Sequence, residues 1–413
     1  FHVAHRLRLP NRMVDQSWSP GFSRLKPGLQ LSTLPAGHLT LQPEWTPMRI
    51  LLSLAVWLTL FCNVESAETL PKFIAPHFAP PAELANQTGD YKSPLRFADG
   101  TEVKSAADWK RRREEILKTW HDLMGPWPAR IEKPKVEILK SEKDGNYTRN
   151  QIRIEVAPDR MSEDAYLLVP DGKGPFPAVV VVFYDAATGV GLGKKTMRDF
   201  AVQLARRGFV TLSLGSAPET YYPSKEKCKL QPLSFHAYVA GNCRTALANR
   251  PDVDAKRIGI VGHSYGGKWA MFASCLDDQF ACAAWSDPGI VFDEKRSNVN
   301  YWEPWYLGFD PDATRKRGIP TDANPRTGPY KTMMEKGRDL HELHALMAPR
   351  PFLVSGGSED LAERWKPLNH SIAVNKLLGF ESRAGLTLRP KHDPTEESNE
   401  QIYVFFEHFL KAK

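Results

Sequence analysis

The stretch RIGIVGHSYGGKWA, residues 257–270, constrains the fold of this chain more than any other part of its 413 residues. A short apolar run typical of a buried strand leads into Ser264, and a helix-like stretch follows at once. The G-x-S-x-G pattern between a strand and a helix predicts a sharp turn that holds the serine hydroxyl above the edge of a parallel sheet. Gly262 and Gly266 favour a close approach of strand and helix. Ser264 is then either a nucleophile or only the cap of the helix.

Strand-like and helix-like segments alternate from residue 177 to the C-terminus, as they do in a parallel sheet covered by helices on both faces. The stretch PAVVVVF at 177–183 is apolar throughout, which is typical of a strand buried on both sides. From Val136 to Pro170, alternating stretches around a turn predict antiparallel strands. The sequence therefore predicts an α/β fold: a doubly wound, mostly parallel sheet with an antiparallel N-terminal entry. Helices are expected at 105–124, 196–207, 233–248, from 265, at 366–378 and at 396–411.

The segment between Asp287 and Leu340 interrupts this alternation. It is rich in glycine, proline and aromatic residues and includes the stretch NVNYWEPWYLGFD. A long irregular insertion after a sheet strand is usually a functional loop or cap, because ligands bind at the carboxyl edge of such sheets.

The N-terminal part predicts an exported protein. From Met48, the stretch MRILLSLAVWLTLFCNVESAET has one arginine, an apolar run and small residues near Ala67, which is the layout of a secretory signal peptide. The apolar run is too short for a comfortable membrane span, so we expect a secreted or periplasmic protein with no stable membrane insertion after cleavage. We divide the chain into an unstructured upstream extension at 1–47, a signal peptide at 48–67, an N-terminal linker at 68–104 and a catalytic domain at 105–413, with an inserted cap or loop region at 288–340.

Charge and cysteine usage exclude several classes of protein. The 55 Lys and Arg residues exceed the 48 Asp and Glu residues only slightly, and the excess is spread along the chain, so no nucleic-acid partner is expected. No cysteine has metal-ligand spacing with histidine, so no metal is expected, and GVGLGKK at 189–195 fails the spacings of nucleotide-binding loops, so we expect no cofactor. Export permits disulfides, and their pairing stays open among Cys228, Cys243, Cys275 and Cys282.

A serine hydroxyl is a weak nucleophile without a base, and the C-terminal part offers one. Folds with this turn supply the partners in the order serine, acid, histidine. His392 lies between a strand-like stretch and a helix start, which places its imidazole on a loop above the sheet edge; a plain surface histidine is the alternative. We favour Asp360, in the loop GGSED, as the acid and keep Asp287, at the end of the strand after the nucleophile helix, as the alternate.

Backbone N–H groups are expected to hold the negative oxygen that forms when the serine attacks a carbonyl. One is the N–H of Tyr265, at the start of the helix after Ser264. The second should come from the loop after the strand 177–183, where Tyr184 and Asp185 are the candidates.

From about Trp109 to its end, the chain resembles the α/β-hydrolase superfamily. The likeness is to secreted carbohydrate esterases: to glucuronoyl esterases first, then to acetyl xylan esterases and dienelactone-hydrolase-like proteins. It rests on the stretches GHSYGGK, SDPG, NYWEPW, PRPFLVSGGSEDLAERW and KHDPTEE. The resemblance implies a secreted serine esterase that removes a uronoyl or acetyl ester, with a small-molecule ester or a polysaccharide as its partner.

Residue roles follow from the resemblance at a few positions. In glucuronoyl esterases the nucleophile motif ends in a lysine that contacts the sugar, and Lys268 matches it. That family can place its acid after either of two strands, which correspond here to Asp287 and Asp360. The chain departs from the pattern at Tyr265, because the family normally has an arginine there that helps to hold the oxyanion.

Aromatic side chains in the insertion and near the acid loop offer flat faces for sugar rings, although packing is the usual role of such clusters. The expected binding residues are Lys268, Trp302, Glu303, Trp305 and Trp365, with Tyr301 and Tyr306 beside them. Two other functions remain open. One is a serine peptidase, because the same groups cleave amides, and the other is a catalytically silent carbohydrate-binding protein.

Overall fold

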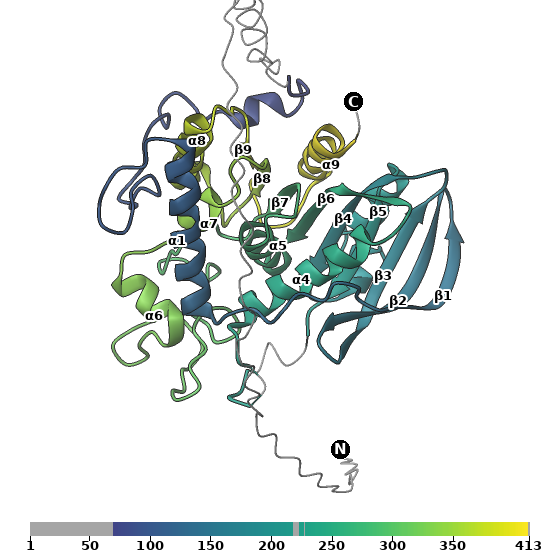
Figure 1. The fold of residues 1–413 in the computed structure, drawn as a ribbon, viewed down its shortest axis with the longest axis horizontal. Helices are drawn as coiled ribbons and strands as arrows, with labels where there is room; N and C mark the ends of the chain where they lie inside the picture. The colour runs from purple at the N-terminus through teal and green to yellow at the C-terminus, as the bar shows by residue number, and fades with distance from the viewer. Residues whose placement is uncertain (1–68, 218–222, 227, 412–413) are drawn as a thin grey trace, which may run out of the picture. The chain divides into compact units, whose positions relative to one another are not determined.

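The computed structural model describes residues 69–217, 223–226 and 228–411 (Figure 1). The expected extension at 1–47 and the expected signal peptide at 48–67 lie outside the described residues. Within the described part, no helix is both long enough and apolar enough to cross a membrane.

One sheet organises the described part of the chain, and nine strands form it in the order β1-β2-β3-β5-β4-β6-β7-β8-β9. The first three strands and the β3–β5 pair are antiparallel, and every other pair is parallel. The predicted mostly parallel sheet with an antiparallel entry is confirmed. The strands are β1 (Val136–Asp144), β2 (Tyr147–Ala157), β3 (Arg160–Pro170), β4 (Phe176–Phe183), β5 (Val210–Gly215), β6 (Val253–His263), β7 (Cys282–Ser286), β8 (Phe352–Gly356) and β9 (Ala384–Leu388).

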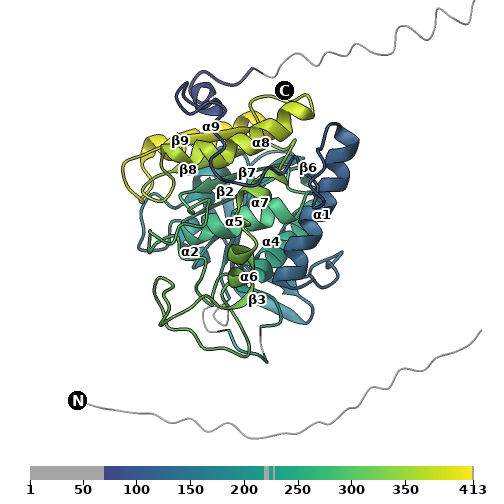
Figure 2. The ribbon, with the colours of Figure 1, turned by 90° about the vertical axis from the view of Figure 1, so that its left-hand side faces the viewer.

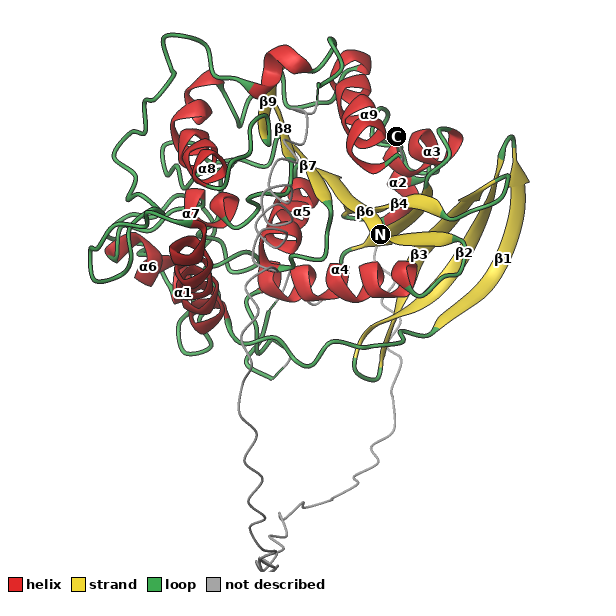
Figure 3. Ribbon diagram, turned by 45° about the horizontal axis from the view of Figure 1, so that its top comes forward, coloured by secondary structure: helices red, strands yellow, loops and turns green. Residues whose placement is uncertain are grey.

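Helices cover both faces of the sheet (Figure 3). On one face, α4 and α5 pack side by side (Figure 2), and α1, α7 and α8 belong to the same core cluster. On the other face, α3 and α9 pack in the second core cluster. The helices are α1 (Ala106–Met124), α2 (Ala186–Gly189), α3 (Phe200–Arg206), α4 (Pro232–Ala248), α5 (Tyr265–Leu276), α6 (Gly328–Glu335), α7 (His341–Ala345), α8 (Trp365–Leu377) and α9 (Glu396–Leu410), with short 3-10 helices at Ala75–Phe78 and Ala362–Arg364.

The central strands are buried because helices lie on both of their faces. In β4 all six inner residues are buried, and alternate valines enter opposite cores: Val180 and Val182 face the core with α4 and α5, whereas Val179 and Val181 face the core with α3 and α9. This is the physical reason why β4 reads as a continuous apolar run rather than as an alternating one.

Two expectations about local structure differ from what is observed. The helix expected at 196–207 begins only at Phe200, after Asp199, and Met197 has a left-handed φ of 59° that no helix allows. Residues 69–104 are packed rather than a linker: Ile74 and Phe78 are buried in the second core, and Asn369 donates a hydrogen bond to the Leu84 carbonyl at 2.9 Å. Spacing alone gave no sign of these long-range contacts.

Candidate active site

Ser264 lies on a tight turn between β6 and α5. Its backbone has φ 57° and ψ −116°, a conformation that costs a non-glycine residue about 1–3 kcal/mol and persists only where the surroundings enforce it. Gly262 and Gly266 do so: a Cβ on Gly262 would lie 2.2 Å from the Gly266 carbonyl oxygen, and one on Gly266 would lie 2.1 Å from that of Val182. The glycines therefore let α5 start directly above the sheet.

His392 lies in the loop between β9 and α9 and faces the serine. Its Nε2 is 2.8 Å from the Ser264 hydroxyl oxygen, and its Nδ1 is 2.7 Å from Oδ2 of Asp287. A carboxylate can only accept, so Nδ1 carries the proton and Nε2 is left to accept from the serine. The helix after this loop starts at a capping box between Thr395 and Ser398, which secures the loop on its C-terminal side.

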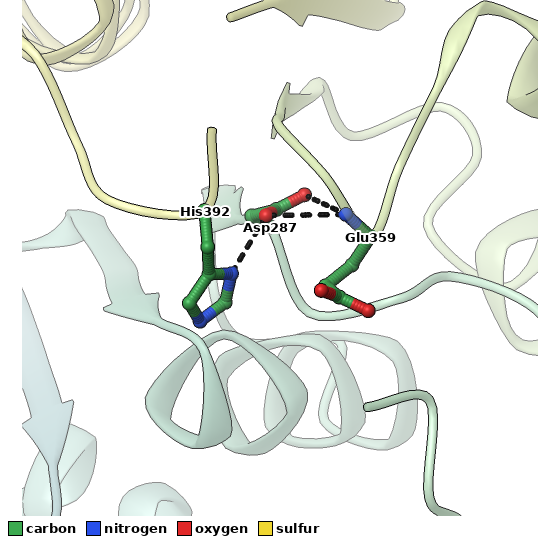
Figure 4. A group of neighbouring side chains, drawn as sticks. All are labelled: Asp287, Glu359 and His392. Atoms are coloured by element: carbon green, nitrogen blue, oxygen red, sulfur yellow. Dashed lines mark hydrogen bonds and ion pairs between the residues drawn. The ribbon is translucent and has the colours of Figure 1, made fainter. Parts of the chain in front are cut away.

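Asp287, at the end of β7, is the carboxylate that contacts the imidazole (Figure 4). Its side chain is fully buried, and its Oδ1 accepts hydrogen bonds from the backbone N–H groups of Gly357, Glu359 and Asp360 at 2.6, 3.1 and 3.0 Å. These bonds leave Oδ2 directed at His392. The loop after β8, which was expected to supply the acid, thus supplies hydrogen-bond donors to Asp287 instead.

Asp360, the acid favoured from the sequence, occupies a different place. Its two carboxylate oxygens accept from the backbone N–H groups of Gly289 and Ile290 at 2.8 and 2.6 Å, and it makes no hydrogen bond with His392 among the described residues. Burial, and then the nearby charge of Asp287, raise the pKa of Asp360 above its usual value. The structure therefore corrects the preference between the two acids, because Asp360 binds the start of the inserted segment instead.

Asp287, Glu359 and His392 also form a group that could hold a metal ion, with one ligand atom each within 4.8 Å of the others. Most of their atoms already serve other hydrogen bonds, however, and Oε2 of Glu359 is the exception within the described residues. Figure 4 shows that Glu359 reaches Asp287 through its backbone nitrogen, while its carboxylate turns away. That carboxylate accepts from Asn298 and from the Ser358 hydroxyl. This bonding is the pattern of a carboxylate that orients a histidine, so we assign the group no metal.

The residues expected to supply the oxyanion donors follow the neighbouring strands β4 and β6. The N–H of Tyr265 belongs to the first turn of α5, where no carbonyl of the helix can accept it. Asp185 caps α2 through a 2.7 Å bond from the Thr188 N–H. The Tyr184 ring stacks on the Tyr265 ring at 5.2 Å, and its hydroxyl faces Ser264: burial raises the pKa of Tyr184, and hydrogen bonding with Ser264 opposes the rise. The hydroxyl of Tyr184 was not anticipated from the sequence.

A cavity of about 750 Å³ lies between Tyr184 and the inserted segment. Ser264 is not among its described lining residues, but Tyr184 is. Its polar lining includes Asn300, Arg315, Arg317 and Thr327, and its aromatic lining includes Trp305 and Tyr306. The insertion between β7 and α7, irregular apart from α6, therefore forms most of the wall of this cavity.

Most of the residues expected to bind sugar lie behind this wall. Trp305 lines the cavity, with the guanidinium of Arg317 at 4.6 Å from its ring centre. Trp302 and Trp365 are buried in the core, and Glu303 is buried where it accepts from the Gly318 N–H at 2.8 Å. Most of the aromatic cluster thus packs in the core, which was the alternative to sugar binding that the sequence left open.

Lys268 is also buried, with 3% of its surface exposed. Its ammonium group donates to the Pro288 carbonyl at 2.5 Å and lies 5.1 and 5.6 Å from the ring centres of Tyr301 and Tyr306. Burial lowers the pKa of Lys268 to about 8. In this structure the lysine fastens the inserted segment to α5 and does not reach the cavity.

Cys228, Cys243, Cys275 and Cys282 are free, so none of the possible disulfide pairings is present in the described part of the chain. Residues that sequence reasoning did not single out are His263, Ser286 and Arg389. Each lies within three positions of a candidate catalytic residue in the sequence. No sequence motif links the three to one another, so nothing in the sequence indicates that they meet.

The nine-stranded sheet, the serine on its strand-to-helix turn and the histidine from the last loop define an α/β-hydrolase. Residues 164–294 match the model of the dienelactone hydrolase family, and residues 240–360 match that of the prolyl oligopeptidase family. The predicted membership of this superfamily is confirmed.

Carbohydrate esterases are among the proteins that are similar to this chain. A curated carbohydrate esterase from an unknown prokaryotic organism is 21% identical in an alignment that covers 77% of this chain and 89% of the relative. Among solved structures, a glucuronoyl esterase from Solibacter usitatus matches with a TM-score of 0.62 at 20% identity, over 78% of this chain and 97% of that one. A putative acetyl xylan esterase from Bacteroides fragilis matches with a TM-score of 0.52 at 14% identity, over 78% and 89%. The expected likeness to carbohydrate esterases is confirmed, and the structural matches show a shared fold.

Proposed function

We propose that this chain is a serine carboxylic-ester hydrolase that removes an ester from a polysaccharide, with Ser264 as nucleophile, His392 as base and Asp287 as acid. One observation carries the proposal: the imidazole of His392 lies within hydrogen-bond distance of the serine hydroxyl on one side and of a buried carboxylate on the other. The serine thus contacts the histidine, and the histidine contacts the carboxylate, which is the chain of contacts that nucleophilic catalysis requires.

The reaction proceeds in two halves. The Ser264 oxygen attacks the ester carbonyl while its proton passes to Nε2 of His392, and Asp287 stabilises the resulting imidazolium through Nδ1–H. The tetrahedral intermediate then expels the alcohol, which takes the proton from His392, and an acyl-enzyme remains. A water molecule, deprotonated by His392, attacks the acyl group, and the acid leaves with Ser264 restored.

Neutral hydrogen-bond donors hold the oxyanion in this proposal. The arginine of the glucuronoyl esterase pattern is absent, because Tyr265 occupies its position. The Tyr265 hydroxyl cannot replace that arginine, because it is bonded to Nδ1 of His236 at 2.6 Å. The donors we propose are the N–H of Tyr265, a backbone N–H at Tyr184 or Asp185, and the Tyr184 hydroxyl, which already faces the serine. Each well-placed donor of this kind contributes on the order of 10²- to 10³-fold to the rate.

The cavity is compatible with a sugar ring as part of the ester. A cavity of about 750 Å³ with Trp305 and several polar groups in its wall is large enough for a pyranose ring, which in a uronoyl ester is the acyl group itself. The similar structures include enzymes named for both substrates, a glucuronoyl esterase and an acetyl xylan esterase. We therefore propose a uronoyl ester as substrate.

The substrate assignment is tested with purified protein against methyl glucuronate, acetylated xylan and a peptide amide of matched solubility. We expect kcat/KM for methyl glucuronate to exceed that for acetylated xylan, with no measurable cleavage of the peptide. Release of methanol, acetate and free amine is the readout. Faster release of acetate would move the assignment to acetyl esters, and cleavage of the peptide would support the peptidase instead.

We also propose export, because residues 48–67 have the layout of a signal peptide. Expression of the full chain in a bacterial host with an active secretion system should yield a processed protein whose first residue lies near Ala67. N-terminal sequencing of the exported material measures this directly. An intact N-terminus in the cytoplasmic fraction, with nothing exported, would contradict the proposal.

A further inference from the structure

The ends of three strands are joined beneath the catalytic groups by a hydrogen-bonded cluster of His263, Ser286 and Arg389, which we call the Ser286 cluster. The Ser286 hydroxyl is its centre: it lies 3.0 Å from Nδ1 of His263 and 3.2 Å from Nη2 of Arg389. All three residues are buried, with at most 6% of their surface exposed. They belong to the ends of β6 and β7 and to the residue after β9.

Each member of the cluster adjoins a different catalytic residue. His263 directly precedes Ser264, and Ser286 directly precedes Asp287. The Ser286 carbonyl also accepts from the Ser264 N–H at 2.8 Å. Arg389 donates from Nη2 to the His392 carbonyl at 2.7 Å and from Nε to the Asp393 carbonyl at 3.0 Å. The cluster therefore holds the nucleophile, the acid and the base from below.

Arg389 can do this because of the shape of its guanidinium. Besides the bonds to the histidine loop, Nη1 donates to the carbonyl and the hydroxyl of Ser355 at 2.7 and 3.0 Å. One planar group thus ties the loop of His392 to the ends of β7 and β8. A lysine ammonium is a compact point charge without this fixed fork and cannot make the same bonds in the same geometry.

His263 restrains the imidazole of His392 from the side. The two ring centres are 4.7 Å apart, with the planes inclined by 41°. Burial, and then the proximity of His392 and Arg389, lower the pKa of His263 well below its usual value, so it stays neutral in this position. Its Nε2 has no hydrogen-bond partner within the described residues, and its polar contacts there are with Ser286.

We propose that the Ser286 cluster sets the register of the catalytic serine, acid and histidine, with Arg389 as the principal positioning residue. The inference rests on the proposed function, since it concerns how that machinery is aligned. Arg389 is not a catalytic residue, because it acts on the backbone of the histidine loop. A loss of this alignment lowers the rate of the chemical step and leaves the substrate cavity unchanged.

The test compares Arg389→Lys with Arg350→Lys in the full chain. Arg350 is a matched control: its guanidinium donates to the carbonyls of Ser274, Asp277, Phe280 and Leu346, far from the reacting groups. We expect Arg389→Lys to lower kcat on methyl glucuronate by about 10- to 100-fold, because a displacement on the order of 1 Å has an effect of that size. KM should change little, and the rate of Ser264 labelling by a fluorophosphonate should fall with kcat.

We expect Arg350→Lys and Arg389→Lys to lower the thermal midpoint by similar amounts. In Arg350→Lys, however, kcat of the folded protein should stay near the wild-type value. An unchanged kcat in folded Arg389→Lys, or an equal loss of kcat in both variants, overturns the positioning role. If Arg389→Lys does not fold, Ser286→Ala decides: it removes the central hydroxyl and keeps the carbonyl that binds Ser264. A wild-type kcat in Ser286→Ala would then reject the inference.

These outcomes are separable from failure of the proposed function. Should the wild-type protein neither hydrolyse the esters nor react with the fluorophosphonate at Ser264, the esterase assignment fails and the cluster loses its role with it. Normal wild-type activity that is equal in all the variants overturns the positioning role alone.

Discussion

Ser264→Ala is expected to lower kcat by a factor on the order of 10⁵ to 10⁶, because the nucleophile of a serine hydrolase acts as one unit with its base. The substitution removes one oxygen from a turn whose geometry the flanking glycines enforce, so the fold should persist. Steady-state hydrolysis of methyl glucuronate measures the loss, and mass spectrometry should show a fluorophosphonate adduct on the Ser264 peptide only in the wild-type protein.

Ser274→Ala provides the matched control for this change. Ser274 is a buried serine of α5 whose hydroxyl bonds to the Ala270 carbonyl within the same helix, away from His392. Its replacement should leave kcat close to the wild-type value and the adduct intact. Retention of most of the activity in Ser264→Ala would show that the hydroxyl is not the nucleophile and would favour the non-catalytic alternative.

Asp287→Asn is expected to lower kcat by a factor on the order of 10⁴, the size of effect seen when a triad carboxylate becomes an amide. Three backbone N–H groups bind Oδ1 of Asp287, so the amide oxygen will take that place and the amide NH₂ will face Nδ1 of His392. Nδ1 must then accept, and the ring proton moves to Nε2. A histidine in that tautomer cannot accept the proton of Ser264.

Asp360→Asn distinguishes the two acids under the same assay. Asp360 is equally buried but binds the backbone of Gly289 and Ile290, so its replacement should lower the thermal midpoint and affect kcat far less. A larger loss of kcat in Asp360→Asn than in Asp287→Asn would return the role of acid to Asp360. Comparable losses in both would mean that the two carboxylates act together.

The choice between these acids shows where sequence reasoning stopped. Asp287 and Asp360 both follow sheet strands, and both positions can present a carboxylate to a histidine on the last loop. What separates them is the direction of each side chain: Asp287 has a left-handed φ of 49° and turns toward His392, whereas Asp360 turns toward the inserted segment. A one-dimensional spacing carries no information on that direction.

Lys268 and the aromatic residues of the insertion illustrate the same limit. Their types predicted sugar contacts, and among the expected sugar-binding residues Trp305 and Tyr306 line the cavity in the structure. Whether a Trp or Lys side chain packs inward or faces a cavity depends on which elements cover it. Here Lys268 belongs to α5, and the rings of Tyr301 and Tyr306 cover its ammonium group.

The sequence by itself determined the order of strands and helices along the chain and the turn that carries the proposed nucleophile, because both depend on local physics. Apolar runs of strand length, helix-length amphipathic segments and two glycines around Ser264 act over a few residues, so they can be read from the chain directly. The tertiary structure alone decided which carboxylate contacts His392, the wall of the cavity and the Ser286 cluster. Those depend on contacts between residues more than twenty positions apart, which form only when strands from distant parts of the chain become neighbours in the sheet.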